Sequence, residues 1–203
     1  IRATNGVAGA ATQSFQITIR ANVPGAPTIT GVTRGNASVQ VSFDAPGADG
    51  GSAITGYTAS CGAQSQTGTA SPLVVSGLTN GVAVTCTVIA TNAVGNSAAS
   101  APSASVTPAT VPGAPTAVVA TRGNAQVSVA FAAPASDGGS AITGYTASCG
   151  AQSQTGPASP IVVSGLTNGV AVTCTVTATN AIGNGAASAP SASVTPATVP
   201  GAP

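Results

Sequence analysis

An internal repeat of 88 residues limits what this chain can fold into more than any other feature of its sequence. The string VPGAP begins at Val23, Val111 and Val199, and 73 of the 88 positions in residues 23–110 recur identically in residues 111–198. A period of this length corresponds to one small domain, which can just sustain a hydrophobic core of its own. The sequence therefore predicts two copies of one domain, at residues 23–110 and 111–198.

The segments outside the two copies fit a longer array. Residues 199–203 repeat the opening of a copy, and residues 1–22 are too few to fold alone. Ala3-Thr4-Asn5 precedes Pro24 by about the distance that separates Ala90-Thr91-Asn92 from Pro112. We therefore expect residues 1–22 to be the C-terminal strands of a preceding immunoglobulin-like domain and residues 199–203 to start a further repeat.

Within each copy, short runs of alternating apolar and polar residues are separated by turn residues, and no helical periodicity occurs. The strands expected in the first copy span residues 28–33, 38–43, 53–61, 72–75, 82–90 and 97–106. Residues 62–68 are either a short edge strand or a loop, and Pro102 interrupts the last strand. About seven short strands of this kind are typical of an antiparallel β-sandwich.

The composition excludes several classes of function. The chain has four arginines, three aspartates and no Lys, Glu or His, which gives a net charge of +1. Without a basic cluster there is no electrostatic attraction for nucleic acid, so we expect no nucleic-acid partner. No apolar run approaches the roughly 18 residues that a membrane span needs.

The same residues cannot supply a catalytic or metal site. Asp44, Asp49 and Asp137 are the only general acids or bases, and the second copy has Ala132 at the position of Asp44. A serine nucleophile would lack a base. One carboxylate in each Asp-Gly-Gly loop is too few for calcium, and Asp-Gly is ordinary turn chemistry. We therefore expect no enzymatic activity, no cofactor and no bound metal.

Each copy contains two cysteines that are 25 positions apart: Cys61 and Cys86 in the first, and Cys149 and Cys174 in the second. An even number in each copy favours one disulfide within each domain, with buried free thiols as the alternative. Two thiolates without histidine cannot complete a tetrahedral metal site. Because disulfides persist in oxidising compartments, the pattern predicts an extracellular or cell-surface location.

Several short motifs occur in the same order in both copies. They are the Pro-Gly-Ala-Pro opening, Ile54-Thr55-Gly56-Tyr57, the turn Gly77-Leu78-Thr79-Asn80-Gly81, and Ala90-Thr91-Asn92-Ala93-Val94-Gly95. This combination resembles the fibronectin type III domains of bacterial extracellular proteins, and the resemblance covers both copies. It implies an all-β fold of tandem, seven-stranded, antiparallel immunoglobulin-like sandwiches.

Two positions depart from the family pattern. Phe43 and Phe131 stand where the family usually has a core tryptophan, and Val84 and Val172 stand where it usually has a corner tyrosine. Both losses imply a weaker core. In this fold the strand that ends at Cys61 pairs with the strand that contains Cys86, on the inward face, so the resemblance implies a compensating disulfide across one sheet.

These observations together predict a non-catalytic structural or adhesive repeat module of an extracellular filament, sheath or surface protein. Its expected partners are neighbouring repeats or further copies of itself, and the Pro-Gly-Ala-Pro linkers are expected to be stiff. The alternatives are spacer domains of a secreted multidomain enzyme, such as a polysaccharide hydrolase, and a weak carbohydrate-binding module that contacts surface glycans. Tyr57 and Tyr145 are the candidate sugar platforms, but their position in the alternation favours a structural role.

Overall fold

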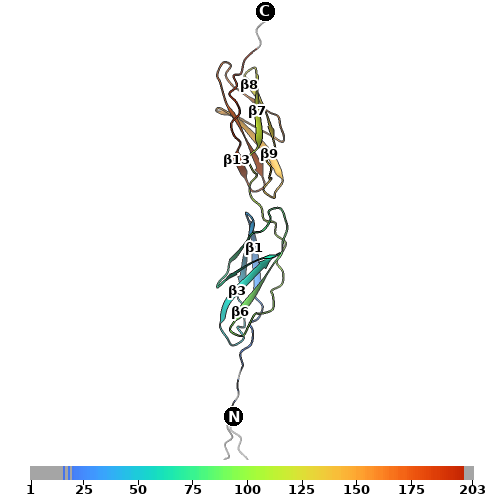
Figure 1. Cartoon of the computed structure of the whole chain (residues 1–203), viewed down its shortest axis with the longest axis vertical. Helices are drawn as coiled ribbons and strands as arrows, with labels where there is room; N and C mark the ends of the chain where they lie inside the picture. Colours follow the sequence, from blue (N-terminus) through green and yellow to red (C-terminus); the bar gives the residue numbers. More distant parts are fainter. Residues whose placement is uncertain (1–15, 17, 19, 199–203) are drawn as a thin grey trace, which may run out of the picture.

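The computed structural model describes residues 16, 18 and 20–198 as two β-sandwiches that lie end to end along the long axis of the molecule (Figure 1). No helix occurs in this described range. Most of residues 1–22, which we expect to belong to a preceding domain, and all of residues 199–203 lie outside it.

Each sandwich consists of two antiparallel sheets. The first contains β1 (Thr28–Gly35), β2 (Ser38–Asp44), β3 (Ile54–Cys61), β4 (Gln64–Gly68), β5 (Leu73–Ser76) and β6 (Cys86–Asn92). Its sheets have the strand orders β1-β2-β5 and β4-β3-β6. Residues 62–68, whose conformation the sequence left open, therefore include an edge strand.

The second sandwich repeats this arrangement and has one more short strand. It contains β7 (Thr116–Gly123), β8 (Gln126–Ala132), β9 (Ile142–Cys149), β10 (Gln152–Gly156), β11 (Ile161–Ser164), β12 (Cys174–Asn180) and β13 (Asn184–Ala187). Its sheets have the strand orders β11-β8-β7 and β10-β9-β12-β13.

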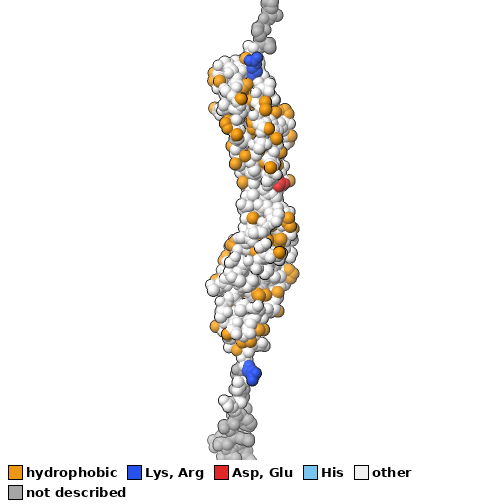
Figure 2. All heavy atoms as spheres, viewed as in Figure 1, with side chains coloured by type: hydrophobic (Ala, Val, Ile, Leu, Met, Phe, Trp, Pro, Cys, Tyr) orange, Lys and Arg blue, Asp and Glu red, His pale blue; other side chains and the backbone are white. Residues whose placement is uncertain are grey.

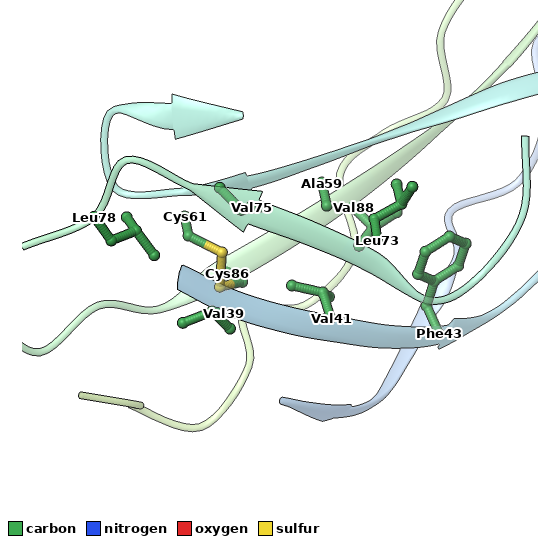
Figure 3. Packing of buried hydrophobic residues seen from close by; sticks show 10 residues of the cluster. All are labelled: Val39, Val41, Phe43, Ala59, Cys61, Leu73, Val75, Leu78, Cys86 and Val88. Atoms are coloured by element: carbon green, nitrogen blue, oxygen red, sulfur yellow. A yellow bond between two sulfur atoms is a disulfide. The ribbon is translucent and has the colours of Figure 1, made fainter. Parts of the chain in front are cut away.

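The core between the sheets is made mostly of small apolar side chains. Val39, Val41 and Phe43 alternate along β2 and point inward, as their period of two requires. They meet Val88 and other inward residues of β3, β5 and β6 (Figure 3). The ring of Phe43 packs on that of Tyr57 at a centroid distance of 4.9 Å, so Tyr57 has a structural role.

In each sandwich a disulfide joins two neighbouring strands of one sheet on its core-facing side. Cys61, the last residue of β3, lies directly opposite Cys86, the first residue of β6, with a Cα–Cα distance of 4.2 Å. Cys149 and Cys174 form the same bridge in the second sandwich. All four side chains are fully buried. Figure 3 shows the first bridge among the valines, where it ties β3 to β6 and occupies core volume.

The strand expected at residues 82–90 is shorter than its alternation suggests. It begins only at Cys86, and Val82, which we expect to point inward, is 53% exposed. The reason is that β3 ends at Cys61, so the residues before Cys86 have no partner in that sheet. Val84 instead exchanges two backbone hydrogen bonds of 2.9 Å with Val106.

The strand expected at residues 97–106 is not a regular strand, and a series of serines replaces it. In the first sandwich the N–H of Ser97, Ser100 and Ser103 donates to the carbonyls of Ala90, Val88 and Cys86. The Oγ of each serine accepts the N–H of the same β6 residue at 2.9–3.0 Å. We call this segment the serine edge; in the second sandwich it comprises Ser188 and Ser191.

The serine edge advances three residues for every two residues of β6. The additional residue at each step bulges away from the sheet, as in a β-bulge, and Pro102 lies in this segment. Each serine Oγ also donates to the carbonyl of the residue that follows it. The outer side of this segment therefore lacks the regular ladder that would allow open-ended strand pairing.

Removing one disulfide should destabilise its own sandwich. The double variant Cys149→Ala/Cys174→Ala opens a loop of about 26 residues and should lower the free energy of unfolding by about 3–4 kcal/mol in the chain-entropy model. Urea unfolding followed by NMR signals of each sandwich measures the change. The first sandwich is the internal control, and an unchanged midpoint for the second sandwich would contradict the prediction. A measurement of the intact mass first verifies both bridges in the parent protein. The mass should be lower than that of the reduced chain by four hydrogens.

The serine edge should be sensitive to the loss of a single hydroxyl. Ser188→Ala leaves the buried N–H of Val176 without its acceptor, and we expect a loss of about 1–2 kcal/mol in unfolding free energy. Ser193→Ala is the matched control, because Ser193 is exposed and lies in the same segment. Equal stability of the two variants in urea unfolding would show that the Oγ bonds contribute nothing.

Candidate functional site

The described residues contain no group of three or more His, Cys, Asp or Glu side chains that could hold a metal ion. Asp49 and Asp137 each use a carboxylate oxygen to accept the N–H of the second glycine that follows, Gly51 and Gly139, at 2.8 Å. Both aspartates therefore shape a turn. Among the described residues no helix is long and apolar enough to cross a membrane.

Each sandwich has a shallow groove between its first strand and its serine edge. Residues 27–32 and 101–104 line the first groove, and residues 114–118 and 188–190 line the second. The lining is apolar or hydroxylic, with neither a charged side chain nor an aromatic ring. The grooves contain no group that selects a particular ligand, and the candidate functional site lies elsewhere, where the two sandwiches meet.

Each sandwich has two ends, which we call its poles. The N-terminal pole comprises the incoming chain and the Asp-Gly-Gly loop, residues 22–25 and 48–52 in the first sandwich and 110–113 and 136–140 in the second. The C-terminal pole comprises the β1–β2 turn, the Asn-Gly turn and the outgoing chain, residues 34–37, 79–82 and 108–109 in the first sandwich and 122–125, 167–170 and 196–197 in the second.

A buried asparagine organises each N-terminal pole. The Nδ2 group of Asn180, which is 4% exposed, donates to the carbonyls of Thr110 and Asp137 at 2.8 Å. Its Oδ1 accepts the N–H groups of Ile182 and Gly183 at 2.9 and 3.2 Å. One amide side chain thus ties the incoming chain, the Asp-Gly-Gly loop and the turn after β12 together, with donors and acceptor all satisfied.

Asn92 makes the same set of bonds in the first sandwich. Its Nδ2 donates to the carbonyls of Asn22 and Asp49 at 2.7 and 2.8 Å, and its Oδ1 accepts the N–H groups of Val94 and Gly95. In the sequence, Asn92 stands out only as a member of the motif that ends at Gly95. Its position as the last inward residue of β6 is the one signal that could have indicated a buried amide.

A second asparagine, Asn80, organises the C-terminal pole of the first sandwich. Its Oδ1 accepts the N–H of Ala37 at 2.7 Å and its Nδ2 donates to the side chain of Asn36 at 2.8 Å, which joins the two turns of this pole. Asn168 does the same in the second sandwich. The N–H of Gly81 donates to the carbonyl of Pro108 at 2.9 Å, so the outgoing chain is bound to the same turn.

The two sandwiches are connected without a free linker, because hydrogen bonds hold both Ala109 and Thr110. The N–H of Ala109 donates to Gly35 of the first sandwich at 3.1 Å, and the N–H of Thr110 donates to Gly138 of the second at 2.8 Å. Consecutive residues are therefore bonded to different sandwiches. We call this connection the joint; it also includes a direct contact between Gly81 and Gly139.

The C-terminal pole of the first sandwich and the N-terminal pole of the second also touch directly, at Gly81 and Gly139. A Cβ atom built on Gly139 would overlap the backbone nitrogen of Gly81 and would lie 2.6 Å from the carbonyl carbon of Asn80. No side chain can therefore be added at Gly139 unless the sandwiches move apart. Gly139 also has φ +80°, a conformation that favours glycine for local reasons.

Comparison with known structures agrees with this architecture. A crystal structure of a run of domains from titin is similar over 87% of this chain and 62% of that one, with 19% identity and a TM-score of 0.51. This likeness shows the fold: the chain consists of tandem β-sandwiches of the immunoglobulin and fibronectin type III kind.

Two further structures are similar to parts of this chain. The FN1–FN3 domains of chicken CNTN1 match 87% of this chain and 66% of that one at 19% identity and a TM-score of 0.44. A structure of titin kinase and its flanking domains matches 43% of this chain and 18% of that one at 26% identity and a TM-score of 0.40. This chain thus spans less than two thirds of each of these structures. No protein-family model and no curated protein sequence matches it.

Removing the Asn180 amide should weaken the second sandwich and loosen the joint. Asn180→Ala leaves the carbonyls of Thr110 and Asp137 without this donor, so the free energy of unfolding should fall by about 1–3 kcal/mol. Amide hydrogen exchange at Thr110 should accelerate, because its bond to Gly138 depends on the same loop.

Asn92→Ala is the matched control for this prediction. It removes the same bonds from the first sandwich, so it should destabilise that sandwich and leave exchange at Thr110 unchanged. Exchange at Thr110 that responds equally to both variants, or to neither, would contradict a specific role for Asn180 in the joint.

Proposed function

We propose that this chain is a non-catalytic structural or adhesive repeat module of an extracellular filament, sheath or surface protein. The observation that carries the proposal is the joint, in which adjacent residues, Ala109 and Thr110, are bonded to different sandwiches. A connection of this kind favours a fixed spacing between successive domains. Fixed spacing is what a load-bearing or distance-setting array requires.

The surface supports the same role. Of the seven charged side chains, all but Arg2 lie in the described residues, and they are Arg20, Arg34, Asp44, Asp49, Arg122 and Asp137. Four of them lie at the poles, Arg20 lies in the chain before the first sandwich, and Asp44 is the last residue of β2. In Figure 2 the visible charged groups occur at the two ends and at the middle, where the sandwiches meet. The flanks can therefore lie against neighbouring copies without charge repulsion or ion desolvation.

The buried disulfides fit an oxidising location, outside the cell or at its surface. The bridges stabilise a core that has two aromatic rings in each sandwich, Phe43 with Tyr57 and Phe131 with Tyr145. A stiff, disulfide-stabilised array would also suit the spacer of a secreted multidomain enzyme. A catalytic domain in the same full-length protein would favour the spacer, and many further repeats would favour the filament or adhesin.

Electron microscopy of the native material tests the proposal. We expect extended assemblies or surface projections with a longitudinal repeat equal to the spacing of one domain or a small multiple of it. Protein that stays soluble and unassembled under all conditions would count against the structural role. Mass spectrometry of the same preparation identifies whether this chain is the component that repeats.

A further inference from the structure

The two C-terminal poles have the same internal bonds but different surroundings. Ala109, at the joint, is 5% exposed, whereas its equivalent Ala197 is exposed. A Cβ built on Gly81 would lie 3.2 Å from the Cα of Gly139, whereas one on the equivalent Gly169 meets no atom of the described residues within 4 Å. The C-terminal pole of the second sandwich, which we call the outer C-terminal pole, is thus a second copy of the surface that the joint covers in the first sandwich.

The two N-terminal poles differ in the same way. Gly138 is buried and Gly139 is half-buried at the joint, while the equivalent Gly50 is half-buried and Gly51 is exposed. Among the residues that the structure describes, a Cβ on Gly51 would meet only the Cα of Ala21, at 3.9 Å. The N-terminal pole of the first sandwich, which we call the outer N-terminal pole, therefore presents the same flat glycine surface that the second sandwich uses at the joint.

Both outer poles are already folded into the conformation that the joint uses. At the outer N-terminal pole the N–H of Asn22 donates to Gly50, and at the outer C-terminal pole the N–H of Gly169 donates to Pro196 at 2.9 Å and that of Ala197 to Gly123 at 3.1 Å. Docking would require no rearrangement of these groups, so it would incur little additional ordering cost.

Charge distinguishes the two kinds of pole. Each C-terminal pole has an exposed arginine, Arg34 or Arg122, and each N-terminal pole has an exposed aspartate, Asp49 or Asp137. Opposite poles attract and like poles repel, although surface charges contribute little energy. The charges therefore favour a head-to-tail order over head-to-head or tail-to-tail contact.

We propose that the outer poles are docking surfaces for a further domain of this same kind, and that the joint is the repeating interface of an array. The outer C-terminal pole, with Asn168 and Gly169, receives the Asp-Gly-Gly loop of the next domain, and the outer N-terminal pole, with Gly51, rests on the Asn-Gly turn of the domain before it. Successive domains then share one separation and one rotation. This inference rests on the proposed structural role.

Residual dipolar couplings measured by NMR test the joint in the present chain. We expect both sandwiches to report one common alignment tensor, because they behave as a single body. Gly139→Val places a side chain against Gly81 and Asn80 and should abolish the common tensor. Gly51→Val is the matched control: φ is +77° at Gly51 and +80° at Gly139, so the local strain is the same, but in the described part of this chain no residue of another sandwich lies against Gly51.

The outer pole is tested by lengthening the chain with another copy of residues 111–198 after Thr198. We expect the third sandwich to adopt the same orientation relative to the second as the second has to the first. Independent tensors in the parent chain, a different second junction, or equal effects of Gly139→Val and Gly51→Val would each overturn the inference. These measurements use soluble protein, so they can fail while microscopy still finds filaments, or succeed where microscopy finds none.

Discussion

The amide side chain of one buried asparagine in each sandwich is the interaction on which the connected structure depends. Asn180 binds the incoming chain and the Asp-Gly-Gly loop at once, so the loop is held where Gly139 can meet Asn80 and Gly81. A charged side chain could not replace it, because buried ions incur a large desolvation cost and a carboxylate offers no N–H donors. In a protein with so few charges, the hydrogen bonds of an amide side chain therefore hold the incoming chain and the loop together in place of ion pairs.

The interior of each sandwich is likewise built from small side chains. The fully buried core is formed largely by valines, which supply modest apolar area per residue. The disulfide restricts the unfolded chain, and the serine edge satisfies the buried N–H groups of β6 through hydroxyls. A regular last strand could have satisfied the backbone equally well, but it would have left an open edge. The serine edge combines hydrogen-bond satisfaction with protection against strand addition.

The repeat, the β-sandwich and the cysteine bridges could be predicted from the sequence, because the period, the alternation and the number of cysteines in each copy are visible in the order of the residues themselves. The strand starting at Cys86 could not be delimited, since alternation continues through Val82 and the end of the partner strand at Cys61 determines the pairing. The serine edge was missed because serines three apart match no regular strand. The joint was missed because the carbonyls that accept from the Nδ2 group of Asn180 lie 40 to 70 positions away in the chain.

The distribution of polar groups assigns different tasks to the flanks and the poles. On the outer face of β3 and β4, Thr58 lies opposite Thr67 and Ser60 opposite Ser65, and β9 and β10 repeat these pairs. Uncharged hydroxyl groups cost less to bury than ions when they find hydrogen-bond partners, but they give little orientation preference, since a shifted neighbour finds similar groups. The poles instead combine a close backbone contact, preformed bonds and opposite charges. In an assembly of this chain, longitudinal register would therefore come from the poles, and the flanks would add cohesion without register.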